Sequence, residues 1–140
     1  IMLSDVQIDL IRRSAERLAA SNVAATDAFY VKLFQTAPAV RPLFSEDMFE
    51  QSEKLWQSIV MIVESADNLD QIRLALMALG KRHVDYGAEP CHYAIVTDVL
   101  IETVSTLMRD EWSADYRAAW TAALGAVCET MLEGAGHRAH

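Results

Sequence analysis

Apolar residues recur every three to four positions along almost the whole chain, and this period constrains the fold more than any other feature. An α-helix has 3.6 residues per turn, so such spacing lines apolar side chains along one helix face. No segment alternates apolar and polar residues as a half-buried strand does. The sequence therefore predicts an all-α protein. Two examples of the period are Val6, Leu10, Ile11, Ala15 and Leu18, and later Leu55, Ile59, Ile62 and Val63.

Residues that begin or end helices divide the chain into six or seven helices. Ser4 and Gln7 have the spacing of a capping box, which marks a helix start. Two prolines in segment 37–44 end the second helix, because proline lacks the backbone N–H that a helix needs. Gly87 and Pro90 mark the end of a later helix and the start of the next. These short proline-bounded turns favour helices packed at an angle over a parallel bundle. Further breaks are expected at 21–22, 65–68 and 111–115.

Length and charge restrict the domain organisation and the partners. A chain of 140 residues predicts a single domain over 1–140, with a core at about 3–133 and a frayed tail at 134–140. The formal net charge of −8 argues against binding to nucleic acid or to an anionic membrane surface, since both attract basic proteins. No signal peptide or long apolar span is found, so we expect a cytoplasmic protein.

The two cysteines suggest no disulfide or metal site. Cys91 and Cys128 lie far apart and lack the close spacing of paired metal ligands. Both occur in apolar helical segments, where a free cysteine behaves as a small hydrophobic residue. We interpret both as buried thiols.

The segment LMALGKRHVDYGAEPCHY, residues 76–93, holds the two central histidines. Leu76, Leu79, Gly80 and His83 share one helix face, so His83 points toward whatever the leucines bury. A glycine in mid-helix costs about 1 kcal/mol relative to alanine, which suggests that something bulky approaches the backbone there. His83 is then either a metal ligand or a core-edge histidine bonded to a carbonyl, beside a packing glycine. By itself this segment favours the second reading, because one histidine is a weak signal.

Two other polar side chains share faces with core residues. Gln51 precedes Leu55 by one helical turn, and Tyr30 lies mid-helix among apolar neighbours. A buried tyrosine hydroxyl needs a hydrogen-bond partner. Either both groups reach water, or they face His83 across one apolar cavity.

Seven short motifs together resemble a bacterial single-domain globin, similar to the haem domain of flavohaemoglobins. The resemblance spans residues 3–132 and implies the globin fold, with its helices around a haem pocket. Several motifs in one order are far more specific than any single one, and they favour the ligand reading of His83. The motifs are FYVKLF (29–34), RPLF (41–44), EQSEKL (50–55), DNL (67–69), GKRH (80–83), HYAIV (92–96) and AAW (118–120).

The resemblance implies how a haem would be held. His83 matches the proximal iron ligand, whereas His92 of the HY pair does not. The C-x-x-C-H motif of covalent attachment is not found, so the implied cofactor is haem b, iron protoporphyrin IX held non-covalently. The resemblance further implies that Phe44, Leu55 and Val96 pack against the haem. Lys54 and Arg82 are candidates for its propionates, or else ordinary solvated charges.

On the side of the haem where O₂ would bind, Tyr30 and Gln51 match a pair of hydrogen-bond donors to O₂. On the side of the histidine ligand, Tyr93 matches a tyrosine that flavohaemoglobins use with a glutamate to tune the basicity of that histidine. This chain departs from that pattern. Ala135 stands at the glutamate position with Glu133 two residues earlier, and Leu124 replaces an expected tyrosine.

The resemblance implies reversible binding of O₂, and of NO and CO, at a five-coordinate ferrous haem. The alternative is a nitric oxide dioxygenase, which turns NO and O₂ into nitrate and needs electrons. No nucleotide-binding glycine loop is found in the 140 residues, so that enzyme would work with a separate reductase. A haem sensor would need an output domain, and a helical interaction module would leave Tyr30, Gln51 and His83 unexplained.

Overall fold

The computed structural model describes residues 2–136 and confirms the all-α prediction, with six α-helices, three short 3₁₀ segments and no strand in that range. Positions 137–140 of the predicted tail lie outside the described residues. The α-helices are α1 (Asp5–Ala19), α2 (Asn22–Thr36), α3 (Phe49–Glu64), α4 (Arg73–Asp85), α5 (Pro90–Met108) and α6 (Ala114–Gly134); the 3₁₀ segments are η1 (Pro38–Leu43), η2 (Leu69–Ile72) and η3 (Arg109–Glu111).

Helix ends fall where the sequence predicts them. The Ser4 hydroxyl accepts a hydrogen bond from the Gln7 backbone N–H at 3.1 Å, and the Gln7 side chain accepts one from the Ser4 N–H at 3.0 Å. This reciprocal pair is the expected capping box. Gly87 has φ of 90° just after α4, a left-handed conformation that glycine adopts without strain. Pro90 is the first residue of α5, where its missing N–H costs nothing.

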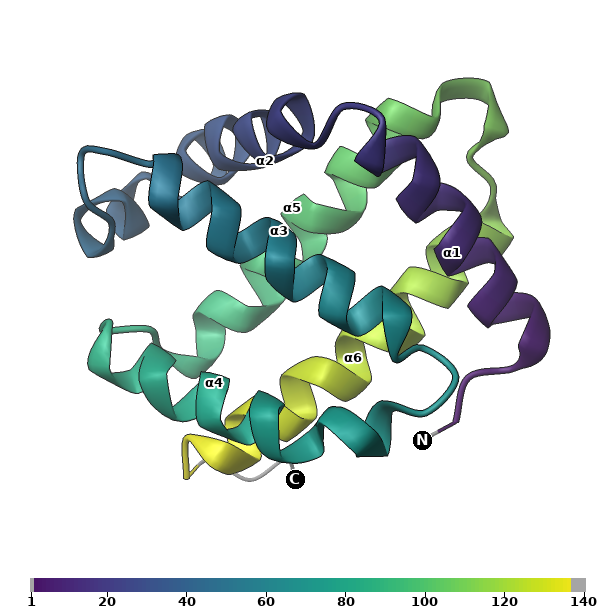
Figure 1. The fold of residues 1–140 in the computed structure, drawn as a ribbon. Coiled ribbons are helices and arrows are strands. Elements are labelled where there is room, and N and C mark those ends of the chain that lie inside the picture. The colour runs from purple at the N-terminus through teal and green to yellow at the C-terminus, as the bar shows by residue number, and fades with distance from the viewer. Residues whose placement is uncertain (1, 137–140) are drawn as a thin grey trace.

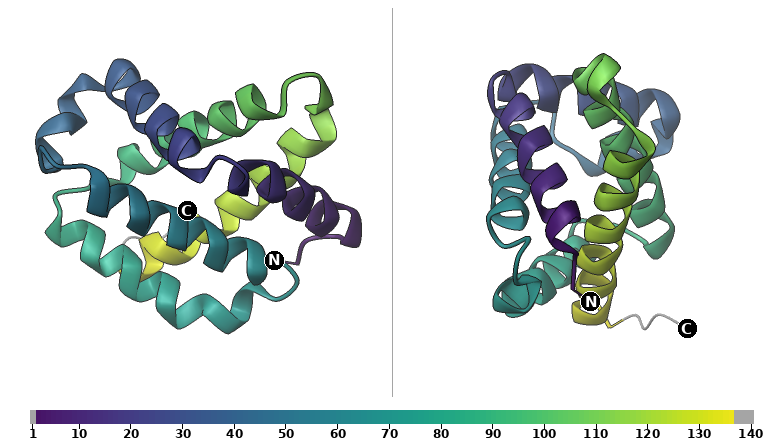
Figure 2. Two further views of the ribbon diagram at one scale, coloured as in Figure 1. Left: turned by 45° about the horizontal axis from the view of Figure 1, so that its top comes forward. Right: turned by 90° about the vertical axis from the view of Figure 1, so that its right-hand side faces the viewer.

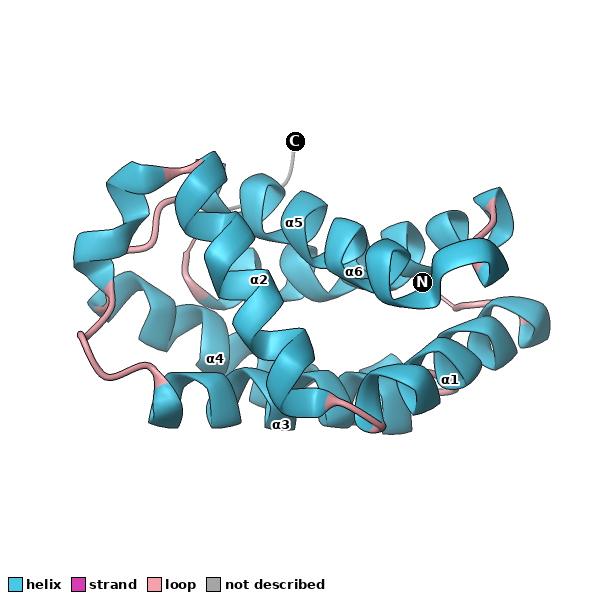
Figure 3. Ribbon diagram, turned by 90° about the horizontal axis from the view of Figure 1, so that it is seen from above, coloured by secondary structure: helices cyan, strands magenta, loops and turns pink. Residues whose placement is uncertain are grey.

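The helices form two layers. Seen from above, α1 and α3 lie in one layer and α5 and α6 in the other, while α2 runs across both (Figure 3). Helix α3 packs on α1 and α2, whereas α4 packs chiefly on α6. Figures 1 and 2 show α4 running beside the C-terminal part of α6. Helices α3 and α4, which carry Gln51 and His83, are therefore held by different neighbours.

The main core contains one polar contact at its centre. Trp120 is only 1% exposed, and its indole N–H donates a hydrogen bond to the Ser14 hydroxyl at 2.8 Å. Ser14 is fully buried and donates to backbone carbonyls of its own helix. The contact joins α1 to α6 and satisfies both polar groups away from water.

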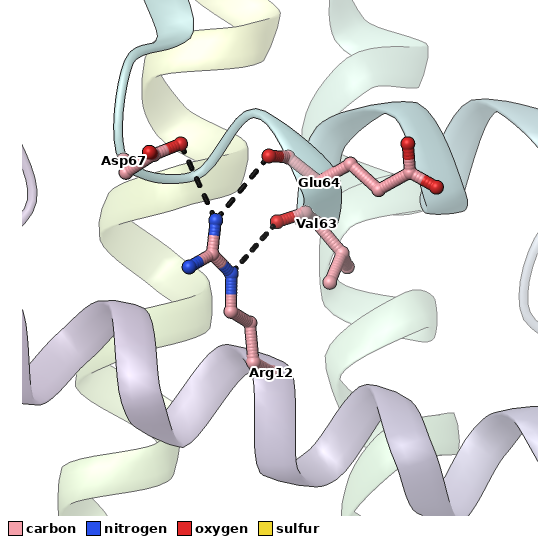
Figure 4. A network of polar contacts seen from close by, with 4 residues as sticks. All are labelled: Arg12, Val63, Glu64 and Asp67. Atoms are coloured by element: carbon pink, nitrogen blue, oxygen red, sulfur yellow. Dashed lines mark hydrogen bonds and ion pairs between the residues drawn. The ribbon is translucent and has the colours of Figure 1, made fainter.

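Arg12 of α1 caps the end of α3 (Figure 4). Its guanidinium donates to the carbonyl oxygens of Val63 and Glu64, at 3.4 and 3.3 Å, and to the Asp67 carboxylate at 3.3 Å. The last carbonyls of a helix have no partner within the helix, so a cation there satisfies them and matches the helix dipole. Arg12 thus fixes the end of the helix that carries Gln51 and Leu55.

Two glycines bring the backbones of α4 and α6 into direct contact. A Cβ atom added at Gly80 would lie 1.9 Å from the carbonyl oxygen of Met131, and one added at Gly134 would lie 2.1 Å from that of Met77. The bulky neighbour expected at Gly80 is therefore the backbone of α6. Gly80 is a packing glycine, as one of the two readings from sequence proposed.

No helix within residues 2–136 combines the length and apolarity needed to cross a bilayer.

The prediction that both cysteines are buried is half wrong. Cys128 is partly buried, but Cys91 lies exposed in the first turn of α5. The exposure of a residue in the first turn of a helix depends on which other segments cover that turn. Apolar neighbours in the sequence therefore do not predict it.

Candidate functional site

His83 lies near the C-terminal end of α4, one turn after the Gly80 contact with α6. Its Nδ1 atom is 2.7 Å from the backbone carbonyl oxygen of Leu79. A carbonyl oxygen only accepts hydrogen bonds, so Nδ1 carries the proton of the neutral ring. Nε2 then has a free lone pair, and the Leu79 carbonyl fixes the orientation of the ring. This is the arrangement in which a histidine binds a metal through Nε2.

Two tyrosines surround the His83 ring. The centre of the Tyr86 ring lies 5.6 Å away at a steep angle, and that of Tyr93 lies 6.3 Å away. Tyr93 belongs to α5 and packs, like Leu79, against a small core between α3, α4 and α6. His83 is partly buried, so its ring is accessible to a ligand while its direction is fixed. The core of this cluster consists of Ile62, Leu76, Val127 and Met131.

His92 has a structural role at the start of α5. Its Nδ1 accepts a hydrogen bond from the backbone N–H of Glu89 at 3.0 Å, and the Glu89 carboxylate accepts one from the backbone N–H of His92. These bonds cap the helix as Ser4 and Gln7 cap α1. Of the two central histidines, His83 is therefore the one whose ring nitrogen is prepared for a ligand.

Tyr30 on α2 lies in an aromatic cluster with Phe34 and Phe44. Its ring centre is 5.9 Å from that of Phe34 and 5.7 Å from that of Phe44, and the two phenylalanines are 5.3 Å apart. Tyr30 is 6% exposed. Burial raises the pKa of its phenol above the ordinary value of 10.0, and a side-chain hydrogen bond with Gln51 partly opposes this rise. The phenol is therefore protonated at neutral pH and able to donate a hydrogen bond.

The fold thus brings together Tyr30, Phe44 and Gln51, which come from three separate segments. Leu55 and Val96 are partly buried against the same main core. The two predicted propionate partners lie at the surface: Lys54 pairs with Glu50 at 3.4 Å on the exposed side of α3, and Arg82 is exposed on α4. Their predicted role remains a prediction.

Glu133, the glutamate nearest to the position that flavohaemoglobins use, forms a contact with another helix. The Glu133 carboxylate forms an ion pair with Arg73 at the start of α4. Ala135 follows the end of α6. Cys128 is another neighbour of Tyr93. Its thiol lies 3.4 Å from the Thr97 hydroxyl, and burial raises the pKa of the thiol. A thiol with a raised pKa is neutral at neutral pH, so it places no negative charge beside Tyr93.

Sequence reasoning missed two aromatic neighbours of the site. Phe34 joins the cluster around Tyr30, and Tyr86 contacts His83. Helical spacing could have predicted both contacts, because Phe34 follows Tyr30 by four residues and Tyr86 follows His83 by three, and residues at these spacings are neighbours on a helix surface.

Comparisons with known proteins identify the family. The Globin family model matches residues 27–131. This chain belongs to the globin family. Flavohemoprotein of Vibrio cholerae is 27% identical over 138 residues, which cover 96% of this chain and 35% of the relative. Leghemoglobin-1 of Lupinus luteus is 27% identical over 139 residues, covering 87% and 88%.

The fold agrees with solved globin structures. The bacterial globin from Campylobacter jejuni superposes with a TM-score of 0.84 at 24% identity, over 95% of this chain and 96% of that one. Family membership and haem-protein relatives indicate that this globin binds haem. The chain spans about a third of the length of the flavohemoproteins that it matches.

Proposed function

We propose that this globin holds haem b non-covalently through Nε2 of His83 and binds O₂ reversibly, with NO and CO as further ligands. The observation that carries the proposal is the 2.7 Å hydrogen bond from His83 Nδ1 to the Leu79 carbonyl, which leaves Nε2 as the one basic ring nitrogen. When bound, the haem iron would supply reversible binding of a diatomic gas. The chain would hold the iron through the fixed imidazole of His83 and would supply hydrogen-bond donors for the gas.

The donors are Tyr30 and Gln51. O₂ in such a pocket carries partial negative charge, so a protonated phenol and an amide N–H both stabilise it. The raised pKa of Tyr30 supports this role, because it keeps the phenol a donor at all ordinary pH values. Each bond contributes on the order of 1 kcal/mol. CO gains little from such donors, so the pair favours O₂ over CO.

The surroundings of His83 support binding over catalysis. A carboxylate bonded to a proximal histidine makes the ring more basic and pushes electron density toward a bound metal. Here the His83 Nδ1–H is donated to a neutral backbone carbonyl, and the Glu133 carboxylate is paired with Arg73. The His83 ring therefore donates to a neutral group, an arrangement suited to reversible gas binding.

The alternative is a nitric oxide dioxygenase that works with a separate reductase. The similarity to flavohemoproteins, of which this chain spans about a third, favours this second candidate. Repeated turnover requires an external electron donor. Measuring NO consumption under air, with and without an added reductase, tests it. Sustained consumption supports the enzyme, and oxidation that stops after one equivalent of NO leaves only the gas-binding protein.

Replacement of each central histidine tests the iron ligand. We expect His83→Ala to lose haem or its five-coordinate ferrous spectrum. His92→Ala is the matched control, because it removes only the helix cap and should keep the Soret band and the ferrous spectrum. If His92→Ala loses them and His83→Ala keeps them, the assignment of the ligand is wrong.

Replacement of the distal phenol tests reversible O₂ binding. Tyr30→Phe removes the hydroxyl but keeps the ring and its contacts with Phe34 and Phe44. Loss of one hydrogen bond worth about 1–1.4 kcal/mol should speed O₂ dissociation about five- to tenfold. Stopped-flow measurement of O₂ and CO dissociation gives the comparison, with CO as the internal control. An unchanged O₂ rate, or equal changes for both gases, would show that the hydroxyl does not contact O₂.

A further inference from the structure

Arg41 of η1 binds the segment that carries Phe44 through both its side chain and its backbone. Its guanidinium donates hydrogen bonds to the backbone carbonyl oxygens of Phe44 and Ser45, at 3.3 and 3.0 Å. The Arg41 carbonyl oxygen in turn accepts a hydrogen bond from the Phe44 backbone N–H at 3.1 Å. One residue therefore holds the backbone of Phe44 at its N–H and at its carbonyl.

The same guanidinium also contacts helix α2. It lies over the Phe34 ring, 5.0 Å from the ring centre. The face of an aromatic ring carries partial negative charge and attracts a cation at this distance. The ion pairs within residues 2–136 do not include Arg41, so its charge is directed at carbonyl oxygens and an aromatic face. The half-buried Arg41 thus links α2 to the segment that follows η1.

The two phenylalanines that Arg41 links are the aromatic neighbours of the proposed distal donor. The Tyr30 ring stacks on Phe34 at an interplanar angle of 29° and meets Phe44 edge to face at 70°. Phe34 belongs to α2 as Tyr30 does, whereas Phe44 comes from another segment. The direction of the phenol therefore depends on where Phe44 lies relative to α2. A hydrogen bond weakens steeply as its angle departs from linear, so small shifts matter.

We propose that Arg41 is a positioning residue for Tyr30. By tying Phe44 to Phe34, it fixes the direction in which the Tyr30 hydroxyl donates to a bound gas. The inference rests on the proposed function, in which Tyr30 donates a hydrogen bond to O₂. A residue that only stabilised the fold would affect O₂ and CO alike, whereas a positioning residue for a donor affects O₂ selectively.

The test is stopped-flow dissociation of O₂ and CO from the haem-loaded chain in three variants. Arg41→Met keeps an apolar stem but removes the guanidinium. Arg41→Lys keeps a cation but lacks the planar fork that reaches two carbonyls. Arg117→Met is the matched control, because the Arg117 guanidinium also lies over an aromatic ring, 5.6 Å from the centre of Trp112, and that ring does not belong to the cluster around Tyr30.

We expect Arg41→Met to speed O₂ dissociation about two- to fivefold and to leave CO dissociation unchanged. Arg41→Lys should fall between this variant and the parent, and Arg117→Met should match the parent. In a Tyr30→Phe background, Arg41→Met should have no further effect on O₂, because the hydroxyl that it positions is gone.

A second measurement reads the aromatic cluster itself. The CO complex is diamagnetic, so nuclear magnetic resonance with labelled phenylalanine and tyrosine reports which rings lie close together. Cross-peaks between the rings of Tyr30 and Phe44 should weaken in Arg41→Met and persist in Arg117→Met. This measurement does not depend on the rate at which any gas leaves.

The proposal is overturned if Arg41→Met leaves O₂ dissociation or the ring cross-peaks unchanged, or if it speeds both gases equally. An effect of Arg41→Met that persists in the Tyr30→Phe background overturns it too. Should Arg41→Met fail to fold, the same comparisons with Arg41→Lys decide. A change in Tyr30→Phe without one in Arg41→Met overturns this inference only, whereas no change in Tyr30→Phe also overturns the donor role on which it rests.

Discussion

Replacing Gly80 by alanine tests whether direct backbone contact between α4 and α6 sets the position of His83. The new Cβ atom would lie 1.9 Å from the Met131 carbonyl oxygen and 2.8 Å from the Met131 Cα. An ordinary contact is 3.4 Å or more, so the two helices have to separate by about 1.5 Å. Neither partner is a flexible side chain, so no rotation relieves the clash.

Two opposing effects determine the size of the change. Alanine gains about 1 kcal/mol over glycine in the interior of a helix. Overpacking typically costs 1–3 kcal/mol, and a clash with backbone lies at or above the upper end of that range. Separation of the helices also loosens the small core that includes Leu76, which is 1% exposed. We expect Gly80→Ala to lower the free energy of unfolding by about 2 kcal/mol.

Gly125→Ala is the matched control on α6, because a Cβ atom there has no neighbour within 4 Å. It should raise the free energy of unfolding by about 0.5–1 kcal/mol. Urea unfolding followed by far-ultraviolet circular dichroism compares the two variants, and the ferrous spectrum reports whether His83 still binds the haem. Equal stability of the two variants, or a Gly80→Ala protein more stable than the parent, would refute the reasoning.

Two further predictions concern the core and the alkaline limit of stability. Ser14→Ala leaves the buried Trp120 N–H without its partner and should lower the free energy of unfolding by about 1–3 kcal/mol. The Ser14→Ala/Trp120→Phe double variant should lose less stability than the sum of the losses of its two single variants. Additive losses would contradict the hydrogen bond. Burial raises the pKa of Tyr30 in the folded chain above its value of 10.0 in the unfolded chain, so the folded state retains its proton longer and stability falls as the pH rises above 10. In urea titrations from pH 8 to 11, Tyr30→Phe should show a shallower fall than the parent, with a remainder from Tyr93 and Cys128, whose pKa values burial also raises. An identical slope would mean that Tyr30 is not buried in solution.

Much of the fold follows from local signals. The apolar period predicts helices because it depends only on which residues share a face, and the caps at Ser4 and Ser113 depend on atoms a few positions apart. The break at Gly87 and the start at Pro90 are equally local. Motif order extends this to the globin family, which the family model confirms over residues 27–131.

The candidate site depends on both levels. The sequence marks His83, Tyr30 and Gln51 as polar residues on apolar faces. The sequence does not decide which ring nitrogen of His83 has a lone pair available for a metal, because that depends on the hydrogen bond to the Leu79 carbonyl. The sequence shows that Glu133 lies two residues before the position of the flavohaemoglobin glutamate, and the structure shows that its carboxylate pairs with Arg73, 60 residues away.

What the sequence alone determines here is the set of helices, their ends and the family, since each rests on short-range spacing. Tertiary structure decides which backbones touch and which charges meet. The Gly80 contact with Met131 and the ion pair of Glu133 with Arg73 both depend on the relative placement of helices that are distant in the sequence. Such placement arises from packing between distant segments, and local residue spacing does not encode the distances between those segments.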